Sequence, residues 1–143
     1  MKGKKEQLLH LMKESPFDRH LDYVLEDVQE GCVRMSLYMK AEIFQNSRGA
    51  VHGGALYGFS GILMGAACAS LGKNTTTMGL QISYLRPAKV DSRVVGIARV
   101  RQSGEKMIRA ECEFHDEEGR SLAHCEGTFF VLQKRPMNVG VAQ

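Results

Sequence analysis

The stretch that decides the fold runs from Asn46 to Leu71 and reads N-S-R-G-A-V-H-G-G-A-L-Y-G-F-S-G-I-L-M-G-A-A-C-A-S-L. From Ala55 to Leu71 it carries no formal charge, which predicts a helix that is apolar on every side. Gly72 follows directly, and glycine is typical of a helix end. A helix of this kind must be buried, so the rest of the chain has to cover it.

This helix begins with two glycines that follow a histidine, a pattern that suits acyl-transfer chemistry. The first backbone N–H groups of a helix have no internal partner, and the helix dipole adds partial positive charge there. Because Gly53 and Gly54 lack side chains, a ligand carbonyl can approach these N–H groups closely. Donors fixed in this way stabilise the negative charge that develops on a carbonyl oxygen. A tight turn without a ligand is the alternative interpretation.

Composition indicates one soluble globular domain over residues 1–143. Hydrophobic residues make up 43% and charged residues 24% of the 143 residues, which is ordinary for such a protein. The formal net charge of +3 suits an anionic ligand but falls short of a nucleic-acid-binding signature. The uncharged run only reaches the lower limit for a membrane span. Its modest hydrophobicity favours a buried helix, so we expect no membrane span.

Cysteine usage suggests reduced thiols in a cytoplasmic protein. The chain has four cysteines, which form neither a CxxC pair nor a metal-ligand spacing: Cys32, Cys68, Cys112 and Cys125. The N-terminus shows no secretory signal pattern. We therefore expect no metal site.

The other segments predict a short helix and six strands that can cover the central helix. Apolar spacing predicts a helix over residues 5–14, which Ser15-Pro16 ends. Alternating apolar and polar residues predict strands at 21–28 and 32–39, then from Thr75 to the Arg86-Pro87 break, and at 93–101, 107–115 and 120–132. With the last four strands in antiparallel succession, the order indicates an α+β fold around one central helix.

The turn D-E-E-G joins the last two strands and suggests a register for their pairing. With His115 opposite Arg120, small and apolar side chains from both strands face the helix. The same register places Leu122 on the solvated face, beside His124 and Glu126.

Together these features resemble the hotdog-fold acyl-CoA thioesterases, in the branch of phenylacetate-degradation-type and 4-hydroxybenzoyl-CoA-type enzymes. The matching residues are Asn46, Gly49, His52-Gly53-Gly54, T-T-M-G-L-Q-I-S-Y-L-R-P-A from Thr76 to Ala88, the G-E-K turn at 104–106, the E-E-G-R turn at 117–120, and G-T-F-F-V at 127–131. The resemblance covers about residues 16–133 and leaves a short C-terminal tail. It implies a hotdog fold, in which a curved antiparallel sheet wraps around one long central helix. It also implies homodimers, usually paired into homotetramers, with active sites at the subunit interface.

The resemblance implies hydrolysis of an acyl-CoA thioester to a carboxylic acid and coenzyme A, with no cofactor besides the coenzyme A of the substrate. By position, Gly54 donates its N–H to the thioester carbonyl, Asn46 and His52 orient the acyl group and the loop, and Thr77 helps to hold the attacking water. These four are the candidate catalytic residues. The candidate substrate-binding residues are Gly53, Ser60, Gly61, Arg86 and Lys106.

A structural role remains open for several of these residues. His52 and Asn46 would also suit a loop that needs fixing, and threonine is common in strands for packing reasons, as at Thr77. Arg86 and Lys106, with other basic residues, would also suit a solvated outer face.

One position departs from the family pattern. The resemblance implies an aspartate or glutamate about nine residues after the motif histidine, but Gly61 stands there, and the run from Ala55 to Leu71 has no acidic residue. A positioned acid or base contributes about 10²–10⁴-fold in rate. The chain is therefore either a thioesterase with a substitute group, such as Ser60, His52 or Glu42, or a weak or inactive acyl-CoA binding protein. A dimeric scaffold or nucleic-acid adaptor fits less well, because no helix-turn-helix fits before the fold.

Overall fold

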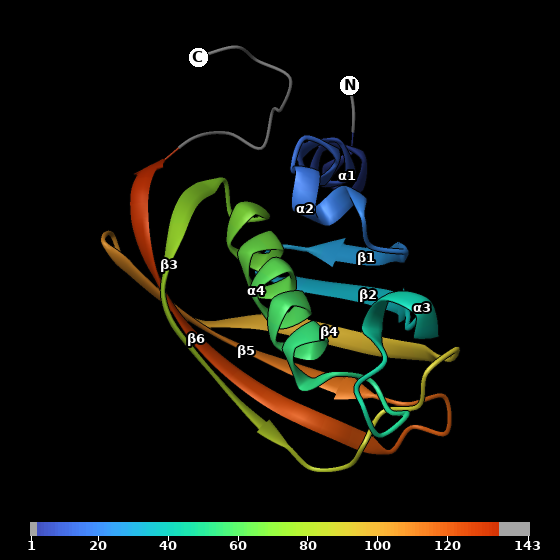
Figure 1. The fold of residues 1–143 in the computed structure, drawn as a ribbon. Helices are drawn as coiled ribbons and strands as arrows, with labels where there is room; N and C mark the ends of the chain where they lie inside the picture. The colour runs from blue at the N-terminus through green and yellow to red at the C-terminus, as the bar shows by residue number, and fades with distance from the viewer. Residues whose placement is uncertain (1–2, 135–143) are drawn as a thin grey trace.

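The computed structural model shows a long helix lying across the concave face of a curved six-stranded antiparallel sheet (Figure 1). The structure describes residues 3–134. The helix is α4 (Gly53–Ala69), and the sheet has the strand order β1-β2-β4-β5-β6-β3. This architecture confirms the predicted α+β hotdog fold. The C-terminal tail expected after about residue 133 lies almost wholly outside the described residues.

The elements follow the predicted order, with two short helices added. They are α1 (Lys4–Lys13), α2 (Pro16–Arg19), β1 (Tyr23–Gln29), β2 (Cys32–Tyr38), α3 (Ala41–Phe44), α4, β3 (Lys73–Tyr84), β4 (Arg93–Ser103), β5 (Met107–His115) and β6 (Ser121–Lys134). The prediction that Ser15-Pro16 ends the first helix is confirmed, but a new helical turn starts there. Ser15 caps it by accepting a hydrogen bond from the Asp18 N–H at 3.4 Å, and proline suits the first helical position.

The core is the interface between α4 and the concave face of the sheet. Phe59, Leu63 and Met64 of the helix are almost completely buried, as are Phe114 and Phe129 of the strands. Each such side chain stabilises the fold by about 1.5–3 kcal/mol through removal from water. None of the helices in the described part of the chain is long and apolar enough to cross a membrane.

Glycines in the strands let α4 approach the sheet closely. A Cβ atom at Gly96 of β4 would overlap Leu63 of the helix and lie 2.9 Å from Cε1 of Phe114. A Cβ atom at Gly127 of β6 would lie 2.8 Å from both Leu80 and Phe129. The separation between helix and sheet therefore depends on these two positions having no side chain.

Strand β3 pairs with β6, so the prediction that the last four strands lie in antiparallel succession is wrong for β3. The succession holds for β4, β5 and β6. After Tyr84 the chain does not turn back beside β3, and β4 instead lies between β2 and β5. As a result β3 forms a free edge, on which Met78 is 58% exposed and Leu85, just beyond the strand, is 61% exposed.

The register expected for the last hairpin is wrong by two residues. Cys112 pairs with Cys125 and Phe114 with Ala123, whereas His115 pairs with Ser121 after a register shift. The turn is longer than expected because one Asp116 carboxylate oxygen accepts the N–H groups of Glu118 and Arg120, at 3.0 and 2.8 Å. Leu122, at the start of β6 next to the register shift, is buried, so the prediction that it lies on the solvated face is wrong.

Two glycine substitutions test the close approach of the helix. Gly96→Ala should lower the free energy of unfolding by about 1–3 kcal/mol, because the added methyl group overlaps Leu63 in a packed core. Gly65→Ala should raise it by about 0.5–1 kcal/mol, because alanine favours a helix and no atom lies within 4 Å of the added Cβ. Urea unfolding of both variants measures the difference, and equal effects would contradict this account.

Candidate functional site

The side chain of His52 caps the N-terminus of α4. Its Nδ1 accepts a hydrogen bond from the Gly54 N–H at 2.8 Å, so His52 is the N-cap of the helix. The His52 N–H in turn donates to the Phe44 carbonyl at 2.6 Å, which fixes the loop to α3. The N–H predicted to bind a thioester carbonyl is therefore present at the helix start and exposed, but it already has an acceptor.

Tyr84, a residue that the sequence analysis did not select, holds the other side of the helix start. Its hydroxyl donates to the Gly53 carbonyl at 2.7 Å, and a Cβ atom at Gly53 would lie 3.0 Å from the tyrosine ring and its hydroxyl. Gly53 must lack a side chain for this contact to form. The sequence feature that could have pointed to Tyr84 is its position at the end of the strand that begins T-T-M-G, which matches the family.

Asn46 fixes the loop before the helix. Its Oδ1 accepts hydrogen bonds from the Arg48 N–H at 2.9 Å and the Ala50 N–H at 3.0 Å, as asparagine does in turns. Gly49 in the same loop has φ +85°, a conformation that favours glycine. These contacts support the structural alternative for Asn46.

Ser60 and Gly61 lie at the middle of α4. The Ser60 side chain is fully buried, and its hydroxyl donates to the Tyr57 carbonyl of its own helix at 2.6 Å. Gly61 is half-buried, and a Cβ atom there would lie 3.3 Å from Cδ1 of Leu80 in β3. Of these two positions, only Gly61 lines an open cavity, between α4 and the first two helices.

One chain does not bring all the predicted residues together. Arg86 lies beside Ser121, at the end of the sheet where α4 begins, and its Nη1 donates to the Ser121 carbonyl at 3.2 Å. Lys106 lies at the other end, about 30 Å away along the nine residues of β5. Thr77 is exposed on the free edge of β3, about 20 Å along the strand from Tyr84.

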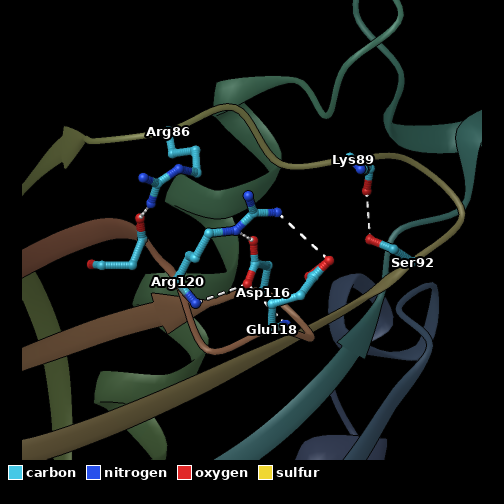
Figure 2. Close-up of polar contacts among 7 residues, drawn as sticks. Arg86, Lys89, Ser92, Asp116, Glu118 and Arg120 are labelled. Atoms are coloured by element: carbon cyan, nitrogen blue, oxygen red, sulfur yellow. Dashed lines mark hydrogen bonds and ion pairs between the residues drawn. The ribbon is translucent and has the colours of Figure 1, made fainter.

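Three cationic side chains surround a pocket next to the loop that precedes α4 (Figure 2). The cavity has a volume of about 570 Å³ and is lined by Gly49, Ala50, Arg86, Pro87, Ala88, Lys89, Val90 and Arg120. The loop is tied to this wall because the Val51 N–H donates to the Ala88 carbonyl at 3.0 Å. The pocket therefore adjoins the helix start through the two residues that lead to His52.

Arg120 in this pocket was not among the predicted site residues, although it closes the matched E-E-G-R turn. Its Nε donates to Asp116 Oδ2 at 2.9 Å, and its Nη2 lies 3.6 Å from Glu118 Oε1 (Figure 2). Desolvation acts to raise the pKa of Asp116, but hydrogen bonds from the Arg120 backbone and guanidinium lower it overall. The ionised carboxylate holds the guanidinium at the rim of the pocket.

A separate cluster on the outer face of the sheet joins Glu111, His124 and Glu126, whose possible ligand atoms lie within 4.8 Å of one another. Glu111 and Glu126 are opposite each other in register, a repulsive arrangement. Arg101 offsets it by donating from Nε to Glu111 Oε2 at 2.7 Å. The cluster lies across the sheet from α4, so it is not part of the candidate site.

The family is decided by the comparison of the sequence with protein-family models. Residues 48–123, more than half of the chain, match the model described as Thioesterase superfamily. The chain belongs to the Thioesterase superfamily. None of the curated proteins matches this superfamily member in sequence.

Solved structures share the fold of this superfamily member. The PaaI protein of the phenylacetic acid degradation operon of Escherichia coli is 22% identical, with a TM-score of 0.85 over 93% of this chain and 96% of that one. Mouse thioesterase superfamily member 2 is 20% identical, with a TM-score of 0.83 over 91% and 98% of the two chains. A hypothetical thioesterase of Streptococcus pneumoniae, solved with coenzyme A, is 24% identical, with a TM-score of 0.77 over 80% and 91%.

The N-cap hydrogen bond of His52 should contribute to the free energy of unfolding of this superfamily member. His52→Ala should lower the free energy of unfolding by about 1 kcal/mol, because the Gly54 N–H loses its acceptor. His52→Asn should keep most of the stability, because an asparagine side chain also caps helices. Thermal unfolding of the three proteins checks this, and equal stability of wild type and His52→Ala would contradict the capping role.

Proposed function

We propose that this superfamily member hydrolyses acyl-CoA thioesters to a carboxylic acid and coenzyme A. The observation that carries the proposal is the exposed start of α4, where two glycines offer backbone N–H groups beside a pocket lined by three cations. The loop that precedes α4 thus has backbone N–H groups for the thioester on one side and positive charges for the phosphate groups of coenzyme A on the other. The thioester is polarised by N–H groups, and the phosphates are held by positive charge.

The thioester carbonyl would take the place of His52 Nδ1 as the acceptor of the Gly54 N–H. This exchange leaves no buried donor unpaired, because one acceptor replaces another. When water adds to the carbonyl carbon, the oxygen gains negative charge, which the N–H and the helix dipole stabilise. The displaced imidazole is then available to contact the acyl group.

The cationic pocket suits the phosphate groups of coenzyme A. Arginine and lysine bind phosphate through charge-assisted hydrogen bonds, and Arg86, Lys89 and Arg120 all border the cavity. Support comes from the S. pneumoniae structure with coenzyme A and from a Streptococcus mutans protein bound to acetyl-CoA, which have the same fold as this chain.

A second copy of the chain would complete the site. The free edge of β3 exposes unpaired backbone groups and apolar side chains, and such edges pair readily with another strand. Antiparallel pairing of two β3 strands about Leu80 would bring Thr77 of one copy toward the helix start of the other. Lys106 would approach the second copy in the same way. We therefore propose a homodimer, and a homotetramer made from two such dimers remains a prediction.

An acyl-CoA binding protein without turnover is the second candidate function. The absence of any acidic residue between Ala55 and Leu71 favours it, because the helix then offers no carboxylate to activate water. The helix start and the cationic pocket would serve hydrolysis and binding equally well. Only a measurement of turnover therefore distinguishes a thioesterase from an acyl-CoA binding protein.

Release of free thiol from a panel of short, long and aromatic acyl-CoAs tests the proposal. We expect turnover above buffer for at least one class. Gly54→Pro should reduce kcat about 10²–10³-fold, because it removes the N–H donor, while proline is tolerated in a first helical turn. Gly54→Ala is the comparison variant, because it keeps the N–H while its Cβ atom, 3.0 Å from His52 Nδ1, disturbs only the histidine cap. Tight binding of acyl-CoAs without any thiol release would instead establish the binding protein.

The cationic pocket is tested with substrates that differ in their phosphates. Arg86→Ala and Arg120→Ala should each raise KM for an acyl-CoA about tenfold, or about 1.4 kcal/mol, through loss of a charge-assisted contact. The same variants should hydrolyse the acyl-pantetheine like the wild type, since that substrate has no phosphate. Arg34→Ala, an exposed arginine of β2 outside the pocket, is the control. An equal loss on both substrates would refute phosphate binding here.

A further inference from the structure

The peptide between Gly53 and Gly54, at the start of α4, is held at both of its polar ends by side chains. Its carbonyl oxygen, on Gly53, accepts a hydrogen bond from the Tyr84 hydroxyl at 2.7 Å. Its N–H group, on Gly54, donates to His52 Nδ1 at 2.8 Å. The carbonyl and the N–H of one peptide belong to a single planar, conjugated unit. The two contacts therefore form one continuous chain of hydrogen bonds, which runs from the tyrosine to the histidine.

The sheet fixes the position of the Tyr84 hydroxyl. Tyr84 is the last residue of β3 and lies opposite Ala123 of β6. Directly after it, the N–H groups of Leu85 and Arg86 both donate to the Leu122 carbonyl, at 2.8 and 3.2 Å. The hydroxyl therefore reaches the helix start from a backbone that is held by the neighbouring strand and not by α4 itself.

The two glycines give this peptide little rigidity of its own. Glycine loses more conformational freedom on folding than any other residue, so a Gly-Gly pair needs other contacts to keep its peptide plane in one orientation. In the proposed reaction the thioester carbonyl replaces His52 as the acceptor of the Gly54 N–H. The contact of Tyr84 with the Gly53 carbonyl is unaffected by this exchange, so it can hold the peptide while substrate is bound.

We propose that Tyr84 is a positioning residue for the thioester hydrolysis, an inference that rests on the function proposed above. By donating to the Gly53 carbonyl, its hydroxyl draws electron density toward that oxygen and makes the Gly54 N–H a stronger donor. It also fixes the direction of this N–H relative to the sheet. When water adds to the thioester carbonyl, negative charge on the oxygen strengthens the whole chain of hydrogen bonds. Tyr84 thereby stabilises the transition state more than the bound substrate.

The protonation state of the hydroxyl suits this role. The ordinary pKa of a tyrosine is about 10, so the hydroxyl keeps its proton at neutral pH. Burial raises the pKa of Tyr84, and electrostatic repulsion from Cys125 and Tyr57 raises it further. A tyrosine that acts as a base or a nucleophile needs a lowered pKa instead. The shift therefore favours a hydrogen-bond donor that acts through the peptide.

Tyr84→Phe tests the inference, because it removes the hydroxyl and keeps the ring. We expect kcat for an acyl-CoA to fall about three- to tenfold, the effect of losing one neutral hydrogen bond, with little change in KM. Tyr38→Phe is the matched control, since it removes a hydroxyl from β2, which β4, β5 and β6 separate from β3 in the sheet. The ring of Tyr38 keeps its contact with Arg93, so this variant should behave like the wild type.

Two further measurements separate an effect on the peptide from support of the fold. In the protein without ligand, Tyr84→Phe should move the amide proton resonance of Gly54 upfield, because a weaker donor makes a weaker hydrogen bond to His52. In the Gly54→Pro background, Tyr84→Phe should cause no further loss of kcat, because the N–H through which it acts is gone. A role in stability alone would lower the melting temperature and reduce activity equally in both backgrounds.

The outcomes distinguish this inference from the function on which it rests. A wild-type protein that releases no thiol from any acyl-CoA overturns the proposed hydrolysis. A wild type that turns over while Tyr84→Phe matches Tyr38→Phe in kcat overturns the role of Tyr84 alone. An unchanged Gly54 resonance in Tyr84→Phe, or a loss confined to KM, also overturns that role.

Discussion

A helix without a charged side chain has to be covered by apolar groups on every side, and this requirement organises the whole chain. The sheet curves around one side of α4, at a separation that Gly96 and Gly127 permit. The first two helices, α1 and α2, cover another side of α4 and leave a groove between themselves and α4. On the side next to β3, α4 is covered by a strand whose outer edge is free, with Leu80 beside Gly61 and Tyr84 beside Gly53. The described residues thus leave a groove beside α4 and a free strand edge next to it.

The N-terminus of α4 shows how one set of backbone groups can serve stability and chemistry. A helix start needs acceptors for its unpaired N–H groups, and His52 provides one for Gly54. In the function that we propose, this exposed imidazole gives way to the thioester carbonyl as the acceptor of the Gly54 N–H. The ligand-free protein therefore keeps its donor oriented, and electrostatic stabilisation of this kind depends on donors that are in place before the reaction.

The sequence allowed the local features to be predicted and left the non-local ones open. The central helix followed from its uncharged run and the strand Met107–His115 from its alternation, because each is set by its own residues. The pairing of β3 with β6 joins distant segments, which no local pattern specifies. The hairpin register failed because Asp116 organises a longer turn than the charged tetrapeptide suggests.

The residues of the candidate site also fall into those that the local sequence indicates and those that only the tertiary fold brings together. His52, Gly53 and Gly54 were found because they are adjacent in the sequence and open a helix. Arg120 was not selected because its place beside Arg86 comes from the tertiary fold. Arg120 closes the matched E-E-G-R turn, but the turn alone does not indicate which other residues lie beside it.

The pairing of β3 with β6 also has a consequence for how the protein is made. During synthesis β3 leaves the ribosome soon after α4, but its partner strand is the last of the six to emerge. Until then the strand has no partner strand in its own chain, and contacts of such sequence separation form slowly. An unpaired strand is exposed to association with other chains during this interval. The edge that we assign to the functional dimer is therefore also the segment at greatest risk of premature assembly.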